Sequence, residues 1–205
     1  AVQAAGLVFG AKRLLDGLPQ GCTAQQFALY KPEEILEALA RNPGQDAAVL
    51  YSGDTGFYSG AAGLLTPLRA LGIPSRVFPG VSSVQLLSAA LGRPWQDWKL
   101  VSAHGCACDP VAECMANHAV FFLTGGTDTP ATLCQKLAAA GLGAAHALVG
   151  ENLSTAEEVI RYGSAAELAK QSFAPLSVLL VENFDLPSFR TPGLEDEAFL
   201  RGDVP

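Results

Sequence analysis

The sequence predicts an α/β fold in which short apolar strands alternate with helices around parallel sheets. Two apolar runs, 47–51 and 75–78, each lead through a glycine-containing turn into a helical pattern. The strand-and-helix order then starts again at residue 99. Repeats of this order build parallel sheets with right-handed crossovers. We therefore expect two α/β domains, at 1–96 and 97–184.

The composition is typical of a compact, water-soluble protein: 49% of the 205 residues are hydrophobic and 16% are charged. No apolar run reaches the roughly 20 residues that a membrane-spanning helix needs. No secretory or transit signal is visible, and the five cysteines lack a disulfide-framework spacing, so we expect reduced thiols in the cytoplasm. The net charge of −7 disfavours a nucleic-acid partner, because phosphate binding needs a basic surface.

The first half is predicted from apolar runs and helix-end signals. Pro32 suits the first turn of a helix, Pro67 should kink one, and Gly72 should end it. Ser82 is a good helix cap. The expected elements are a strand at 7–9, a helix at 32–39, a buried strand at 47–51, a helix at 59–71, a strand at 76–78 and a helix at 83–91.

The second half has more strands than helices, so we expect a mixed sheet there. Its expected elements are strands at 99–102, 119–124, 145–149, 158–162 and 177–182, with helices at 111–116 and 130–140. The segment 94–97 is the expected boundary between the domains. Residues 185–205 are polar and proline-rich, which is typical of a tail or linker.

The two turns of the first half, Ser-Gly-Asp-Thr-Gly-Phe-Tyr-Ser at 52–59 and Pro-Gly-Val-Ser-Ser-Val-Gln at 79–85, predict a small-molecule pocket. Both should lie at the carboxyl edge of a parallel sheet, where α/β folds bind ligands. Asp54 and Ser82 also have purely structural explanations, as a turn residue and a helix cap. Neither phosphate-binding glycine fingerprint occurs, which disfavours phosphate-based nucleotides.

Soft metal ligands gather in one stretch of the second half. His104, Cys106, Cys108, Cys114 and His118 lie within fifteen residues. The usual pair of Cys-x-x-Cys half-sites of a zinc site is absent, so small thiols packed in the fold are the simpler explanation. We expect no metal.

Four motifs in series carry a family resemblance. The two turns above, Ser-Ala-His-Gly at 102–105 and Gly-Glu-Asn-Leu at 150–153 resemble the tetrapyrrole methylases, in order from about residue 4 to residue 183. Within that family they resemble the enzymes that methylate C5 of a corrin precursor in cobalamin biosynthesis. The segment 190–199 resembles the connector of the fused C5,15-methyltransferases, in which a second domain performs C15 methylation and decarboxylation.

The resemblance implies a two-domain class III methyltransferase with a parallel-sheet domain, a mixed-sheet domain and an active-site cleft between them. It also implies S-adenosylmethionine as methyl donor, a cytoplasmic homodimer and a late corrin precursor, of the precorrin-6Y or cobalt-precorrin-6/7 step, as substrate. The donor contacts that it implies are Gly53, Asp54, Phe57, Tyr58, Ser82, Ser83, Leu123, Thr124, Glu151, Asn152, Leu176 and Ser177.

The tetrapyrrole is an anion with several carboxylates, which basic side chains would bind. Lys12 and Arg13 are the candidates for that contact, with a solvated surface pair as the structural alternative. His104 is a candidate for substrate contact, and it is the candidate for proton transfer because the ordinary pKa of an imidazole suits that task. A buried structural histidine is the competing explanation for His104.

Three departures from the family stand out. The family opens with a strand and a Gly-x-Gly-Pro-Gly turn, and no such motif stands before residue 1. Thr55 replaces the usual proline, and Cys106 replaces an arginine that would contact an anion.

Two other functions remain open on the sequence alone. An enzyme of the same fold could methylate diphthine or ribosomal RNA, although the acidic balance disfavours RNA. A non-catalytic module could use the same loops to bind an adenosyl ligand. Copurification of an ultraviolet-absorbing adenosyl compound would favour ligand binding over a purely structural domain.

Overall fold

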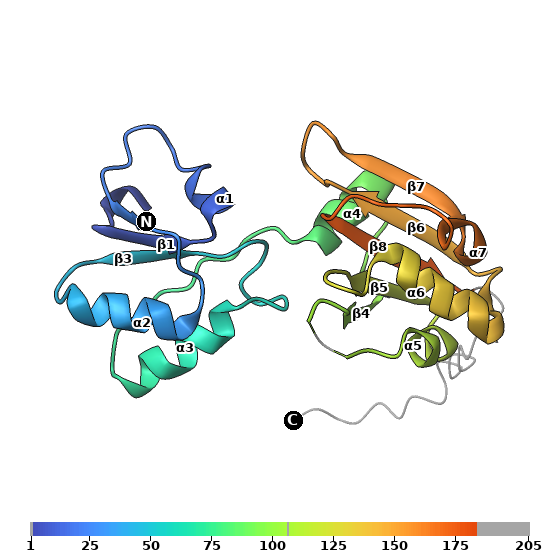
Figure 1. Cartoon of the computed structure of the whole chain (residues 1–205), viewed down its shortest axis with the longest axis horizontal. Helices are drawn as coiled ribbons and strands as arrows, with labels where there is room; N and C mark the ends of the chain where they lie inside the picture. Colours follow the sequence, from blue (N-terminus) through green and yellow to red (C-terminus); the bar gives the residue numbers. More distant parts are fainter. Residues whose placement is uncertain (1, 106, 184–205) are drawn as a thin grey trace, which may run out of the picture. The chain divides into compact units, whose positions relative to one another are not determined.

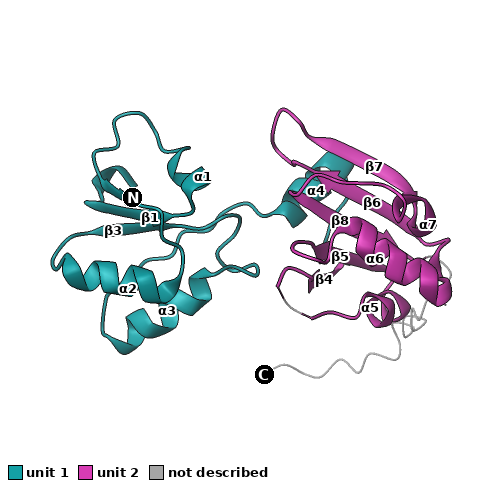
Figure 2. Ribbon diagram, in the orientation of Figure 1, with its two compact units in different colours: residues 1–95 teal, residues 96–205 magenta. Residues whose placement is uncertain are grey.

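The computed structural model describes residues 2–105 and 107–183. The chain divides into two compact units, one ending at Trp95 and the next beginning at Gln96 (Figure 2). Both units are α/β, with a parallel sheet in the first and a mixed sheet in the second, as the sequence predicts. None of the helices in the described ranges is long and apolar enough to cross a membrane.

The first unit is built on a three-stranded parallel sheet of order β2-β1-β3. Its strands are β1 (Leu7–Gly10), β2 (Gln25–Phe27) and β3 (Ala47–Leu50), and its helices are α1 (Lys12–Leu15), α2 (Pro32–Arg41), α3 (Ala61–Ala70) and α4 (Ser83–Leu91), after a 3-10 turn at Val2–Ala4. Helices α2 and α3 cover one face of this sheet (Figure 1). The core between them consists of Leu7, Phe9, Ile35, Ala38, Leu64 and Leu68.

Local signals set the ends of these helices. Pro32 occupies the first turn of α2, and two glutamates in that turn complement the helix dipole. Helix α3 runs through Pro67 and ends before Gly72, which has a left-handed φ of 67°. Ser82 and Gln85 form a capping box at the start of α4.

The edge of the first sheet differs from the sequence prediction. The sequence predicts a buried β3, but among the described strands β3 pairs only with β1, and its residues are partly or fully exposed. The strand expected at 76–78 is wrong: this segment is irregular and exposed. A strand forms only where another strand satisfies its backbone, and 76–78 pairs with no described strand. Apolar composition alone therefore misled the prediction. Strand β2, which is short and polar, was not predicted.

The second unit holds a five-stranded mixed sheet of order β4-β5-β8-β6-β7. Its strands are β4 (Lys99–Ser102), β5 (Ala119–Leu123), β6 (His146–Glu151), β7 (Val159–Ser164) and β8 (Ser177–Glu182). Its helices are α5 (Pro110–Ala116), α6 (Pro130–Leu137), which continues into a π turn at Ala138–Leu142, and α7 (Ala165–Leu168), which was not predicted. Strands β4 and β5 run parallel, and β8 runs antiparallel to β5 and β6.

The core of the second unit lies between this sheet and its helices. All six residues of the central strand β8 are buried. Phe122 and Leu133 pack with the thiols of Cys114 and Cys134 in one apolar cluster. Asp109 caps α5 by accepting hydrogen bonds from two backbone amides, and Ser164 and Glu167 form a capping box on α7.

Candidate functional site

The two glycine turns that the sequence singles out are bonded to each other in the first unit. The Asp54 carboxylate accepts a hydrogen bond from the Gly56 amide at 2.7 Å and another from the Gly80 amide at 3.1 Å. The Thr55 hydroxyl donates to the Phe78 carbonyl at 3.2 Å. Asp54 therefore has the structural role that was its alternative explanation, and it joins both turns instead of closing only its own.

Glycine is required where these turns meet. A Cβ on Gly80 would lie 2.4 Å from the carbonyl oxygen of Gly53, so the two backbones could not stay in place. Gly53 has a φ of 74°, and a Cβ there would lie 3.0 Å from the Ser82 hydroxyl. The contact of Gly80 with Gly53 could not be predicted from the sequence, because it depends on the distance between two turns that are far apart in the chain.

Two hydroxyl groups near these turns are buried and make no hydrogen bond within the described structure: Tyr51 Oη, directly before the first turn, and Ser83 Oγ, in the first turn of α4. Burial raises the pKa of the Tyr51 phenol. Ser82 itself is 5% exposed, and its amide donates to the Gln85 side chain at 2.7 Å. Ser83 therefore has a polar atom free for a ligand, whereas Ser82 is used by the helix.

Aromatic rings follow the first turn. The rings of Phe57 and Tyr58 meet edge to face with centroids 4.9 Å apart, and Tyr58 has a left-handed φ of 47°. Tyr58 is 54% exposed, so it is no core anchor. An exposed aromatic ring on a constrained backbone offers a flat apolar surface to a ligand.

Lys12 and Arg13 begin α1, directly after β1. Because β1 and β3 are parallel, with Gly10 opposite Leu50, these basic residues and the turn at 52–59 leave the same end of the sheet. Lys12 and Arg13 are both exposed, and the Lys12 ammonium lies 3.1 Å from the Asp16 carboxylate. Such an exposed pair contributes little to stability and can exchange partners.

The predicted residues of the second unit gather at one end of its sheet. Register pairs Ser102 with Leu123, Leu123 with Val178 and Glu151 with Ser177, so β4, β5 and β6 end at the same edge of the sheet at which β8 begins. The Thr124 hydroxyl donates to the Ser177 carbonyl at 2.6 Å in a buried position. The backbone amide of Asn152 donates to the Leu176 carbonyl at 2.8 Å.

Glu151 is held by its neighbours. It is 5% exposed, and its carboxylate accepts from Arg161 Nε at 2.5 Å and from the Ala174 amide at 2.6 Å. These contacts hold the segment before β8 against the end of β6. The next residue, Asn152, has a left-handed φ of 48° and turns the chain away from the sheet. His104 is exposed at the end of β4, so the buried-histidine alternative does not hold.

No group of three or more potential metal ligands gathers among residues 2–105 and 107–183. Cys106, part of the sequence cluster, lies outside the described residues. Cys22, Cys108, Cys114 and Cys134 are free thiols. Burial raises the pKa of Cys114 and of Cys134 to about 12, so these two thiols stay protonated at neutral pH.

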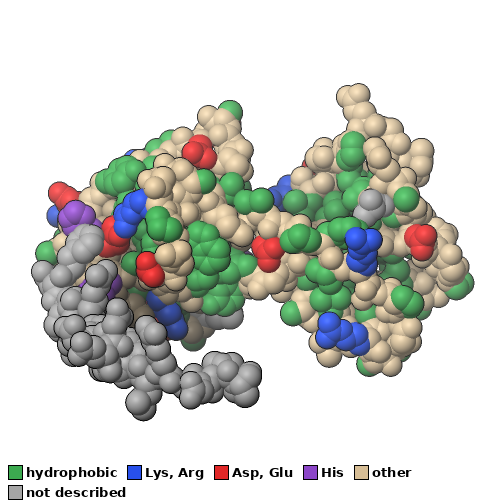
Figure 3. All heavy atoms as spheres, turned by 180° about the vertical axis from the view of Figure 1, so that it is seen from behind, with side chains coloured by type: hydrophobic (Ala, Val, Ile, Leu, Met, Phe, Trp, Pro, Cys, Tyr) green, Lys and Arg blue, Asp and Glu red, His purple; other side chains and the backbone are tan. Residues whose placement is uncertain are grey.

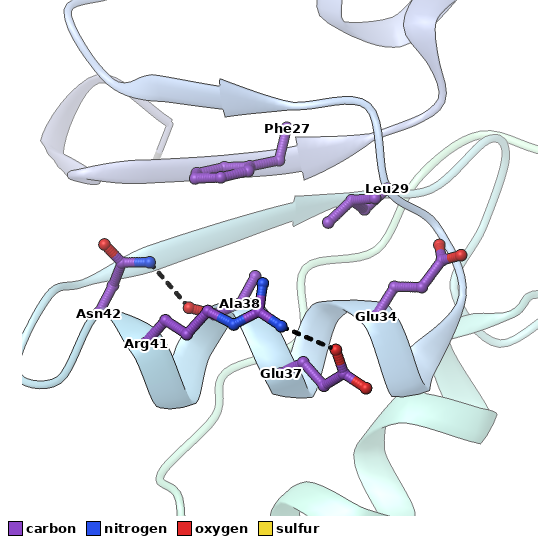
Figure 4. Close-up of a pocket in the computed structure, with 7 residues that line it drawn as sticks. All are labelled: Phe27, Leu29, Glu34, Glu37, Ala38, Arg41 and Asn42. Carbon is purple, nitrogen blue, oxygen red and sulfur yellow. Dashed lines mark hydrogen bonds and ion pairs between the residues drawn. The ribbon is translucent and has the colours of Figure 1, made fainter.

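A cavity of about 250 Å³ lies elsewhere in the first unit, between β2 and α2 (Figure 4). It is lined by Phe27, Leu29, Glu34, Glu37, Ala38, Arg41 and Asn42. The charged groups of Arg41 and Glu37 face each other there at 3.2 Å, and Asn42 donates to the Ala38 carbonyl. None of the residues predicted to bind the methyl donor lines this cavity.

Comparison with known proteins decides the family. Residues 1–169 match the sequence model of the tetrapyrrole (corrin/porphyrin) methylases. This chain belongs to that family. As a tetrapyrrole methylase it is a methyltransferase, as the motifs of the sequence suggested.

Two curated relatives are about one-third identical to this tetrapyrrole methylase. The precorrin-6Y C(5,15)-methyltransferase [decarboxylating] of Sinorhizobium sp is 31% identical over 181 residues, which is 87% of this chain and 43% of that protein. The chain thus spans less than half the length of that relative. The cobalt-precorrin-7 C(5)-methyltransferase of Salmonella typhimurium is 33% identical over 166 residues, 79% of each chain.

Solved structures of other tetrapyrrole methylases share the fold. A cobalt precorrin-4 methyltransferase covers 88% of this chain and 85% of its own at a TM-score of 0.71 and 18% identity. The precorrin-6Y methylase of Archaeoglobus fulgidus covers 88% and 86% at a TM-score of 0.61 and 24% identity. The uroporphyrin-III C-methyltransferase of Thermus thermophilus, solved with S-adenosyl homocysteine, covers 88% and 87% at a TM-score of 0.68 and 19% identity.

Proposed function

We propose that this tetrapyrrole methylase transfers a methyl group from S-adenosylmethionine to C5 of a late corrin precursor. The observation that carries the proposal is the agreement between the two relatives. One is a long C5,15-enzyme and the other a C5-enzyme of more similar length, and both are about one-third identical to this chain over most of its residues. The C5 step is what their names have in common.

The residues present fit S-adenosylmethionine, which carries no phosphate. In the first unit, the Ser83 hydroxyl, which has no partner in the described structure, offers a hydrogen bond, and the exposed Tyr58 ring offers an apolar surface, without a cluster of cations. We assign donor contacts to the predicted residues, and we give Asp54 and Glu151 a supporting role because their carboxylates are already bonded.

When bound, S-adenosylmethionine supplies an electrophilic methyl group: its sulfur keeps the electron pair of the broken C–S bond, and the ring carbon provides the pair for the new C–C bond. The protein orients the acceptor and excludes water. Correct orientation of the reactants can lower the activation barrier by roughly 7–11 kcal/mol. Lys12 and Arg13 would bind acceptor carboxylates, since both stand exposed at the end of β1.

The assembly of this protein is proposed from the family resemblance. We propose a cytoplasmic homodimer, and a fused partner domain like that of the longer C5,15-methyltransferase relative. RNA as substrate is disfavoured by the net charge of −7. On the face drawn in Figure 3, the lysine and arginine side chains of the described residues are scattered and form no continuous basic patch.

Calorimetric titration with S-adenosylhomocysteine tests the proposal. We expect one site per chain in the micromolar range, weakened by Asp54→Ala because the two turns lose their brace. Asp46→Ala is the matched control: Asp46 is exposed and stands before β3, whereas Asp54 follows that strand. Absence of binding would reject the methyltransferase function. Binding without methylation of precorrin-6Y would favour the non-catalytic module instead.

A further inference from the structure

The imidazole of His104 lies directly against the backbone of Gly125. Strands β4 and β5 are parallel and end side by side, with Ser102 opposite Leu123. His104 and Gly125 each lie two residues beyond these strand ends. A Cβ placed on Gly125 would lie 1.8 Å from Nδ1 of His104, 2.6 Å from Cε1 and 2.9 Å from Cγ. Only glycine leaves room for the ring in this position.

The backbone of Gly125 is itself fixed. Its amide donates to the Asp128 carbonyl at 3.1 Å, and the Asp128 amide donates back to the Gly125 carbonyl at 3.2 Å. Gly126 continues the turn with a left-handed φ of 61°. The ring therefore rests on a closed turn at the end of β5, one residue after the buried Thr124–Ser177 hydrogen bond.

We propose that Gly125 is a positioning residue that seats His104 for the methyl transfer. This inference rests on the proposed function. Nδ1 is the ring atom nearest to Gly125, with Cε1 and Cγ on either side of it, so Nε2 and Cδ2 lie on the far side of the ring, and the residue is exposed just after the strand. A seated ring presents Nε2 in one direction, whereas an unseated exposed side chain would sample several rotamers.

Proton transfer is the task that this geometry fits. Methylation of an enamine carbon leaves an iminium in the macrocycle. The N–H proton of that iminium passes to Nε2 of His104, and the N–H bonding pair stays on the ring nitrogen, which becomes a neutral imine. A positioned imidazole accepts such a proton near neutral pH.

The substitution Gly125→Ala tests whether Gly125 fixes the position of the His104 ring. The atoms that it displaces belong to the end of one side chain, and the φ of Gly125 is outside the left-handed region, so the fold should tolerate alanine. The matched control is Gly126→Ala, which strains a left-handed φ but meets no atom within 4 Å. Both variants are compared with His104→Ala and with the double variant Gly125→Ala, His104→Ala.

The first readout is the NMR spectrum of the histidine rings in the ligand-free chain. The chain has three histidines, and the signals that vanish in His104→Ala assign the ring in question. We expect Gly125→Ala to shift these signals and Gly126→Ala to leave them in place. Unchanged His104 signals in Gly125→Ala would show that Gly125 does not position the ring, and this conclusion needs no measurement of enzyme activity.

The second readout is methylation of precorrin-6Y. We expect Gly125→Ala to lower kcat by at least about tenfold, while the affinity for S-adenosylhomocysteine stays within about twofold. His104→Ala should lose a similar factor, the double variant should lose no more, and free imidazole should restore part of the rate to both His104→Ala variants. Full activity with a displaced ring, or additive losses, would overturn the proposal. Failure of the parent chain to bind S-adenosylhomocysteine would reject the proposed function, and the NMR result would still decide the seat.

Discussion

The candidate residues of the two units are held in place by different means. In the second unit they stand at the end of a five-stranded sheet whose central strand β8 is buried at every position. In the first unit the turns rest on an edge strand, β3, and on hydrogen bonds of Asp54 and Thr55 that are exposed to solvent. The sheet register preorganises one set of residues, whereas a few polar contacts and two glycines organise the other.

High pH should affect the second unit most. Cys114 and Cys134 have a pKa of about 12 in the folded chain, against 9.0 for an ordinary thiol. Between pH 9 and 12 the unfolded thiols ionise and the folded ones do not, so stability falls as the pH rises, by up to ~1.4 kcal/mol per pH unit for each thiol. Urea unfolding on either side of pH 9, followed by Trp98 fluorescence in a Trp95→Phe background, measures this loss.

The control for that prediction is the double variant Cys114→Ala, Cys134→Ala, which should show a smaller loss above pH 9. Cys22→Ala, at a half-buried thiol of the first unit, should leave the loss unchanged. An equal loss of stability in the double variant would show that the buried thiols are not its cause.

Gly80→Ala should be the most damaging single change for ligand binding. The new Cβ meets the Gly53 backbone at 2.4 Å and must push the two turns apart. Overpacking of this kind costs ~1–3 kcal/mol, so we expect the affinity for S-adenosylhomocysteine to fall by about 10- to 100-fold. Calorimetry measures it, with Gly17→Ala as control, where the nearest atom lies 3.6 Å away. Parent-like binding by Gly80→Ala would mean that the turns can separate freely.

Thr124→Val should have a smaller effect on binding, because the ladder of β5, β8 and β6 stays intact. The Ser177 carbonyl loses a buried donor, which should lower the free energy of unfolding by ~1–2 kcal/mol. Affinity for S-adenosylhomocysteine should fall by about fivefold at most. The exposed Thr66→Val serves as control for both urea unfolding and calorimetry. A loss of affinity larger than that of Gly80→Ala would reverse the comparison between the units.

Sequence patterns predicted most of the fold because the periodicities and helix-end signals agreed with the packing. They failed at 76–78, where the apolar residues stay exposed and irregular, and at β2, where only three mostly polar residues pair with β1. Both errors concern strand pairing, which depends on partners distant in sequence. Short-range patterns carry no information on such partners.

The candidate site could be predicted from the sequence to about the same extent as the fold. Motif positions placed the two turns together, although the strand at 76–78 on which that prediction partly rested does not form and the turns are joined by Asp54 instead. The contact of Gly80 with Gly53 and the seat of His104 on Gly125 could not be predicted, since both depend on distances of a few ångströms between separate segments. Asp54 and Glu151 were expected to contact the donor, and the structure shows their carboxylates bonded to the backbone.

One edge of β3 pairs with no strand in the part of the chain that the structure describes, and this bears on how the protein behaves in solution. The segment 71–81, which follows α3, also exposes apolar side chains: Leu71, Ile73, Val77, Phe78 and Val81. A free strand edge and exposed apolar side chains both favour association between molecules. The apparent molar mass from light scattering should therefore rise with concentration, and Val81→Asp, at a residue that is 63% exposed, should suppress that rise.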